Sequence, residues 1–96
     1  MSKSINTDIE LDPKQKVVRV LHAGGFKVVG LGLIKGQILD KHKTQTPAFL
    51  FVHVGAVEFS IEGETTLMSA GSYFEIPADV EHEVKAIEDS RLLLIK

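Results

Sequence analysis

Short runs of alternating apolar and polar residues recur along the chain, and glycines separate many of them. Alternation with a period of two is typical of β-strands that bury one face, and no stretch has the period of an amphipathic helix. Strands spaced roughly ten residues apart predict an all-β fold, a small antiparallel β-barrel or jelly roll of two packed sheets. The expected core residues are Leu31, Leu33, Leu50, Val52, Val57, Phe59, Ile61, Ile76, Val84, Leu92 and Leu94.

An apolar stretch at residues 26–34 lacks this alternation and is expected to form a central strand covered on both faces. Gly30 and Gly32 lie two apart in it and therefore point to the same face. Glycine adds no side-chain packing to a strand, so this face should make room for another group. The candidates are a neighbouring backbone or bulky side chain, a bound ligand, or a partner subunit.

The length of 96 residues corresponds to one domain, and 44% hydrophobic residues suffice for one core. We expect a polar N-terminal arm or edge strand at residues 1–15 and a single barrel domain at residues 16–96. The chain has no cysteine, which excludes disulfides and thiolate metal sites. No apolar run approaches the ~20 residues of a membrane span, and the N-terminus lacks the apolar core of a signal peptide. The expectation is a cytoplasmic protein without a membrane partner.

Charge gives no reason to expect a nucleic-acid partner, since the formal net charge is −2. Basic residues are concentrated in the first half of the chain and acidic residues in the second. An antiparallel fold interleaves the two halves, so these charges are expected to pair on a solvated surface.

His42 and His82 bracket the most informative stretch of the chain. Each follows a glycine-punctuated run of alternating apolar residues, a pattern that lets strands distant in sequence carry both imidazoles to one pocket. His82 shares its face with Val84 and should point inward, where an unpaired imidazole costs about 1–3 kcal/mol. A ligand, a water molecule or His42 is its natural partner. The predicted pocket residues are His42, Thr44, Ala48, Leu50, Val52, His82 and Val84.

The spacing of glycine, proline and histidine resembles the two motifs of the cupin superfamily, over residues 16–95. The matching residues are Gly36, His42 and Gly55 in the first motif and Gly71, Pro77 and His82 in the second. The resemblance implies a small jelly-roll barrel, in agreement with the alternation.

The resemblance also implies where a metal would bind. Cupin metal ligands are two histidines and a glutamate of the first motif and the histidine of the second. His42 and His82 match the first and last ligands, whereas Thr44 and Ala48 replace the other two. A stable site takes three or four protein ligands, so a divalent transition metal should bind weakly. Asp40 is the candidate third ligand in a shifted alignment of the first motif.

The histidine pair also has a purely structural explanation. The two residues would then be neutral histidines of a barrel that has lost its metal, hydrogen-bonded to each other, to water or to Thr44. Asp79 replaces the inner glycine of the second motif and is expected either to stiffen that turn or to place a charge near the mouth of the pocket. His53 lies three residues after Leu50 on the same expected strand, so His53 should point outward if Leu50 points inward.

Three functional classes remain open. The first is a barrel that binds a small molecule, polar or carboxylate-bearing, without chemistry. The second is an enzyme, either a metal-dependent cupin dioxygenase, isomerase or lyase, or a metal-free sugar epimerase with histidine as base. The third is a structural or partner-binding module. The incomplete ligand set favours the first class, and we assign no catalytic residue. An outward apolar row of Phe49, Phe51 and His53 predicts a homodimer.

Overall fold

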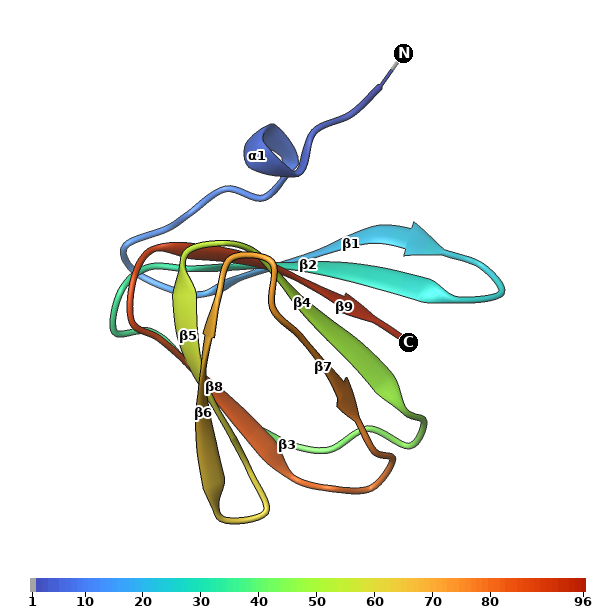
Figure 1. Ribbon diagram of the computed structural model, residues 1–96. Helices are drawn as coiled ribbons and strands as arrows, with labels where there is room; N and C mark the ends of the chain where they lie inside the picture. The colour runs from blue at the N-terminus through green and yellow to red at the C-terminus, as the bar shows by residue number, and fades with distance from the viewer. Residues whose placement is uncertain (1) are drawn as a thin grey trace.

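Two antiparallel β-sheets packed face to face make up the computed structural model, which describes residues 2–96 (Figure 1). The strands are β1 (Val17–Ala23), β2 (Lys27–Leu33), β3 (Ile38–His42), β4 (Ala48–Val54), β5 (Ala56–Ile61), β6 (Glu64–Ser69), β7 (Tyr73–Ile76), β8 (His82–Ala86) and β9 (Ser90–Ile95). Five strands form one sheet in the order β1-β2-β9-β4-β7, and four form the other in the order β3-β8-β5-β6. Within residues 2–96 no strand pairing joins the two sheets, so the fold is an open jelly roll, as the alternation predicted, and not a closed hydrogen-bonded barrel.

The core lies between the sheets and contains every residue predicted for it. Along β4, buried and half-buried residues alternate, which confirms that Leu50 and Val52 point inward. Phe59 is fully buried at the centre, with its ring centroid 4.7 Å from that of Phe74. The period of two therefore correctly predicted which face of each strand is buried.

The N-terminal arm crosses the outer face of the five-stranded sheet (Figure 1). It contains one helical turn, α1 (Ile5–Asp8), followed by the fully buried Ile9. A Cβ atom at Gly30 would collide with the Ile9 side chain, and one at Gly32 would lie 2.5 Å from the Glu10 carbonyl oxygen. The two glycines therefore make room for backbone and side chain of the chain's own arm. The division of the chain at residue 16 stays a prediction, and residue 1 lies outside the described part.

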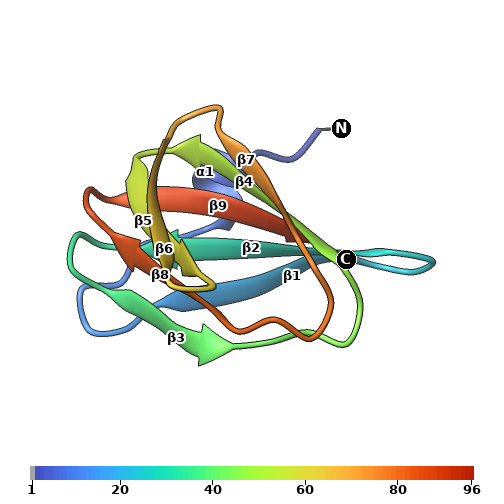
Figure 2. The same cartoon turned by 60° about the horizontal axis from the view of Figure 1, so that its bottom comes forward.

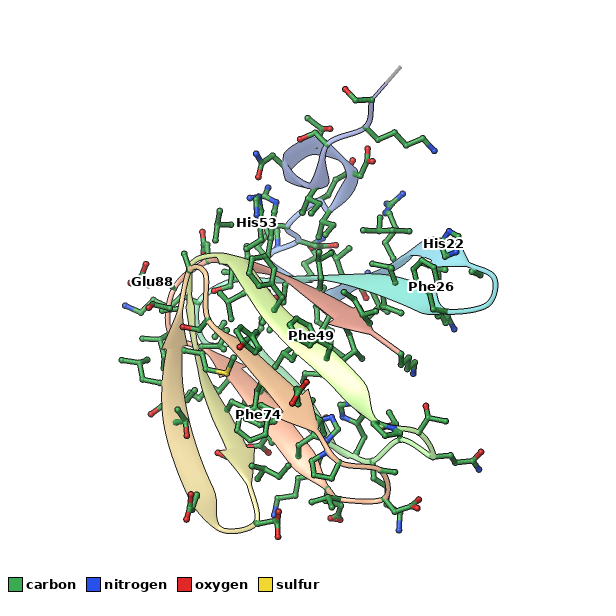
Figure 3. All side chains as sticks on the ribbon, turned by 45° about the vertical axis from the view of Figure 1, so that its right-hand side comes forward. His22, Phe26, Phe49, His53, Phe74 and Glu88 are labelled. Carbon is green, nitrogen blue, oxygen red and sulfur yellow. The ribbon has the colours of Figure 1, made fainter. Side chains whose placement is uncertain are left out.

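The outward row expected at a dimer interface is partly covered within the chain. Phe49 stacks on Tyr73 with ring centroids 5.0 Å apart. His53 points outward as predicted, and its Nε2 lies 3.0 Å from Oδ1 of Asn6 in the arm (Figure 3). The homodimer and the cytoplasmic location remain predictions. No helix within residues 2–96 has the length and apolarity needed to cross a membrane.

Candidate functional site

His42 and His82 meet where two neighbouring strands end and begin. His42 is the last residue of β3, His82 is the first of β8, and the two are register partners in this antiparallel pair. Their Nε2 atoms lie 3.1 Å apart, with ring centroids 4.2 Å apart and an interplanar angle of 62°. The fold thus brings together the two histidines that the motif spacing singled out.

One backbone carbonyl group fixes the tautomer of each ring. His42 Nδ1–H donates to the Asp40 carbonyl oxygen at 2.9 Å, and His82 Nδ1–H donates to the Val80 carbonyl oxygen at 3.2 Å. A carbonyl oxygen only accepts, so each Nδ1 must carry its hydrogen. In the neutral pair both Nε2 atoms then carry a lone pair and face each other at hydrogen-bond distance. One shared proton, one donor group of a ligand, or one cation completes this arrangement.

The surroundings of the pair favour the neutral form of His82. Its side chain is only 2% exposed, and the Phe59 ring lies 5.9 Å away between centroids. Burial lowers the pKa of His82, the bond to the Val80 carbonyl opposes this effect, and the neighbouring His42 lowers the pKa further. His42 is half-buried and forms the accessible side of the pair. At neutral pH, His82 therefore offers a lone pair and not a second charge.

A backbone hydrogen bond ties together the two loops that flank the pair. Asp79 N–H donates to the Thr44 carbonyl oxygen at 2.8 Å. Asp79 has a φ of +62°, the left-handed conformation that glycine adopts without strain and aspartate tolerates. This explains how aspartate can replace the inner glycine of the second motif. The Thr44 hydroxyl donates to the Thr46 carbonyl oxygen, so its hydrogen is used within its own loop.

The predicted pocket residues occupy two different environments. Ala48, Leu50, Val52 and Val84 all belong to the packed hydrophobic core. Accessible space instead adjoins His82 as a depression of about 310 Å³. It is lined by Lys41, Ser60, Ile61, Glu62, Gly63, Thr65, Glu81, His82 and Glu83. Sequence reasoning missed this depression because most of its lining comes from strand ends and turns, which have no diagnostic pattern.

The donor set for a metal is limited to two imidazole nitrogens. Within residues 2–96 no three histidine, aspartate or glutamate side chains gather closely enough to hold an ion. Asp40 binds His42 through its backbone carbonyl, and its side chain is exposed. His53 lies on the opposite face of β4 from the core and bonds to the arm. The residues present therefore do not fit a tight mononuclear site, which takes three or four protein ligands.

Comparison with known families agrees with the geometry of the two motifs. A family model described as a cupin domain matches residues 33–96, a segment that includes both histidines. This chain belongs to the cupin family. No curated protein sequence matches this cupin.

Solved structures of similar shape support the same fold. A conserved protein of unknown function from Streptococcus pyogenes matches with a TM-score of 0.89 and 23% identity, over 99% of this cupin and 84% of that chain. An RmlC-like cupin from Desulfovibrio desulfuricans matches with a TM-score of 0.89 and 22% identity, over 99% and 93%. KdgF from a Halomonas species matches with a TM-score of 0.77 and 24% identity, over 90% and 82%. Identities at this level show a shared fold.

Proposed function

We propose that this cupin binds a small polar or carboxylate-bearing molecule at the His42–His82 pair. The observation that carries the proposal is the convergence of two Nε2 atoms at 3.1 Å while both Nδ1 atoms are held by carbonyls. A hydroxyl or amine of a ligand can donate to an Nε2 lone pair. When one Nε2 holds an extra proton the pair becomes a cation, and a carboxylate that accepts from this Nε2–H, in place of the other ring, gains a charge-assisted hydrogen bond.

The depression beside His82 has room for a small molecule, and His82 is the member of the pair that lines it. A volume of about 310 Å³ lies at the lower end of the range of ligand pockets. Lys41 borders the depression with a positive charge, and Glu62, Glu81 and Glu83 border it with negative charges. Hydrogen-bond-donating groups of a small ligand are complementary to the three glutamates, and an acidic group of the ligand would pair with Lys41.

A divalent transition metal should bind weakly through the same two nitrogens. Imidazole suits such metals, but two protein ligands leave the remaining positions to water or to the bound molecule. We therefore derive no step that depends on a metal.

A second candidate function is proton transfer by His82, in an enzyme of the isomerase or lyase type. The observation that favours it is the combination of a lowered pKa and an Nε2 lone pair on a buried ring. A neutral imidazole can act as general base at neutral pH. Turnover of a substrate by the wild type, lost in His82→Ala, would favour this candidate over simple binding.

Isothermal titration calorimetry with a panel of small hydroxy acids, amino acids and Zn²⁺ tests the proposal. The variants are His42→Ala and His82→Ala, and the matched control is His22→Ala, an exposed histidine at the far end of β1. We expect one panel member to bind the wild type and His22→Ala with equal affinity. The same molecule should bind neither His42→Ala nor His82→Ala. Unchanged affinity in both site variants would refute the assignment of the pocket. If the wild type instead holds one metal ion tightly per chain and turns over a substrate, the protein is an enzyme and the binding proposal is wrong.

A further inference from the structure

A groove of about 500 Å³ lies where β4 begins and where β7 and β9 end. Figure 2 shows these three strands side by side, with β4 in the middle. Among residues 2–15 of the arm none lines the groove, because the arm meets β4 at its other end, where Asn6 bonds to His53. The lining residues are Pro47, Ala48, Phe49, Glu75, Ile76, Pro77 and Ile95.

Strand pairing places three of these side chains in one row across the sheet. Phe49 is the register partner of Glu75 on β7 and of Ile95 on β9. Paired residues of antiparallel strands point to the same face. Ala48 and Ile76, their neighbours in the chain, are buried in the core, so the row lies on the outer face. A carboxylate, an aromatic ring and an aliphatic side chain therefore lie next to one another along the groove.

Two prolines stand at the end of the groove. Pro47 precedes β4 and Pro77 follows β7, directly beyond the last pair of this ladder, Ala48 and Ile76. Proline has no backbone N–H to donate, so the ladder stops there and each proline presents a rigid apolar ring. Apart from Glu75, every lining residue within residues 2–96 is apolar. An occupant would therefore bury an apolar body.

The single charge of this lining is negative. Phe49 (Figure 3) is stacked on Tyr73, with ring centroids 5.0 Å apart and an interplanar angle of 13°. The face of an aromatic ring attracts a cation through its quadrupole, and the carboxylate of Glu75 attracts a cation by its charge. The same carboxylate would repel an anion. The groove is therefore complementary to a molecule that is apolar and positively charged.

We propose that this groove binds a small organic cation with an apolar body, of the arylalkylammonium class. The ammonium group pairs with Glu75, and the body lies against Phe49, Ile95 and the two prolines. The volume of about 500 Å³ falls within the range of small-molecule pockets. The groove shares no lining residue with the depression beside His82, so this inference is independent of the histidine pair.

The fluorescence of the protein itself reports on this groove. The chain has no tryptophan and one tyrosine, Tyr73, which stacks on Phe49 in the groove lining. Titration with 2-phenylethylammonium, excited at a wavelength that its phenyl ring does not absorb, should change the emission of Tyr73 saturably. We expect a dissociation constant on the order of 1 mM for so small a ligand. 3-Phenylpropionate has the same ring but carries a carboxylate, and it should bind at least about fivefold more weakly.

The variant Glu75→Gln removes the charge and keeps the size of an exposed side chain. It should weaken binding of 2-phenylethylammonium about two- to fivefold, and it should not weaken binding of 3-phenylpropionate. The matched control is Glu64→Gln, an exposed glutamate on β6, which should bind both molecules as the wild type does. Amide shifts in ¹H–¹⁵N spectra should place the bound cation at Phe49 and Ile95.

Several results would overturn the proposal. They are the absence of a saturable change, equal affinities for the cation and the carboxylate, and an affinity that Glu75→Gln leaves unchanged. Amide shifts confined to residues 60–65 and 81–83 would place the cation in the depression beside His82 and would also overturn it. If the emission of the ligand-free protein changes on dilution, a second copy of the chain covers the groove and the proposal is wrong.

Discussion

The substitution Gly32→Ala should displace the N-terminal arm from the sheet. The added Cβ would lie 2.5 Å from the Glu10 carbonyl oxygen and 3.1 Å from Cγ2 of Ile9. The nearer atom belongs to the backbone and cannot rotate away, so the arm has to shift.

The cost follows from what holds the arm in place. Ile9 is fully buried, and burial of such a side chain contributes about 1.5–3 kcal/mol. Arg91 Nε–H donates to the Ile9 carbonyl oxygen at 2.8 Å, which adds about 1.5 kcal/mol for a charged donor. The gain from lower unfolded-state entropy on a Gly→Ala exchange is only about 0.4–1 kcal/mol. We therefore expect a net loss of about 2–4 kcal/mol, which lowers Tm by at least about 8 °C for a domain of this size.

Thermal unfolding followed by circular dichroism measures this effect. The matched control is Gly25→Ala, since a Cβ at Gly25 meets no atom within 4 Å. The double variant Ile9→Ala, Gly32→Ala should lose less stability than the sum of the single variants, because both remove the same packing. Equal Tm values for Gly32→Ala and Gly25→Ala would refute the packing of the arm on β2.

Three further predictions concern titration, a buried hydroxyl and metal removal. Because burial lowers the pKa of His82 below 6.5, the unfolded chain binds the proton first as the pH falls, so stability present above pH 6.5 is lost below it. Urea titrations at pH 7 and 5 should show this loss in the wild type and less of it in His82→Ala; equal losses would contradict it. Ser90→Ala should cost about 1–3 kcal/mol in the same assay, because the buried Oγ accepts from Ala56 N–H at 3.1 Å, whereas the exposed Ser69→Ala should cost little. Dialysis against EDTA should leave Tm unchanged, because two imidazoles make no tight site, and a fall of several degrees would reveal a stabilising metal.

The fold was predictable because burial in a two-sheet domain imposes a period of two on each strand. The hairpin of β4 and β5 illustrates this, since Val57 and Phe59 are buried while Glu58 between them is not. The one-turn helix at Ile5–Asp8 was not predicted, because four residues are too short to carry a helical period. The burial of Ile9 likewise depends on a tertiary contact with two glycines far along the chain.

The sequence predicted which histidines meet but not how they are held. The motif spacing singled out the two histidines, and the pairing of β3 with β8, which shifts register between Leu39 and His42, brings His42 opposite His82. The groups that orient the rings are the backbone carbonyls of Asp40 and Val80, and every residue has such a carbonyl. Asp40 was predicted to act through its carboxylate, whereas its contact with His42 comes from the main chain. Side-chain patterns cannot encode that difference.

The most direct test of the proposed site is the tautomeric state of its two rings. Long-range ¹H–¹⁵N correlation spectra at pH 8, above the ordinary pKa of histidine, distinguish protonated from lone-pair nitrogens. We predict Nδ1–H and an unprotonated Nε2 for both His42 and His82, with a bound panel molecule shifting both Nε2 signals and leaving those of His22 unchanged. An Nε2–H tautomer in either ring of the ligand-free protein would contradict the convergence of two lone pairs on which the proposed function rests.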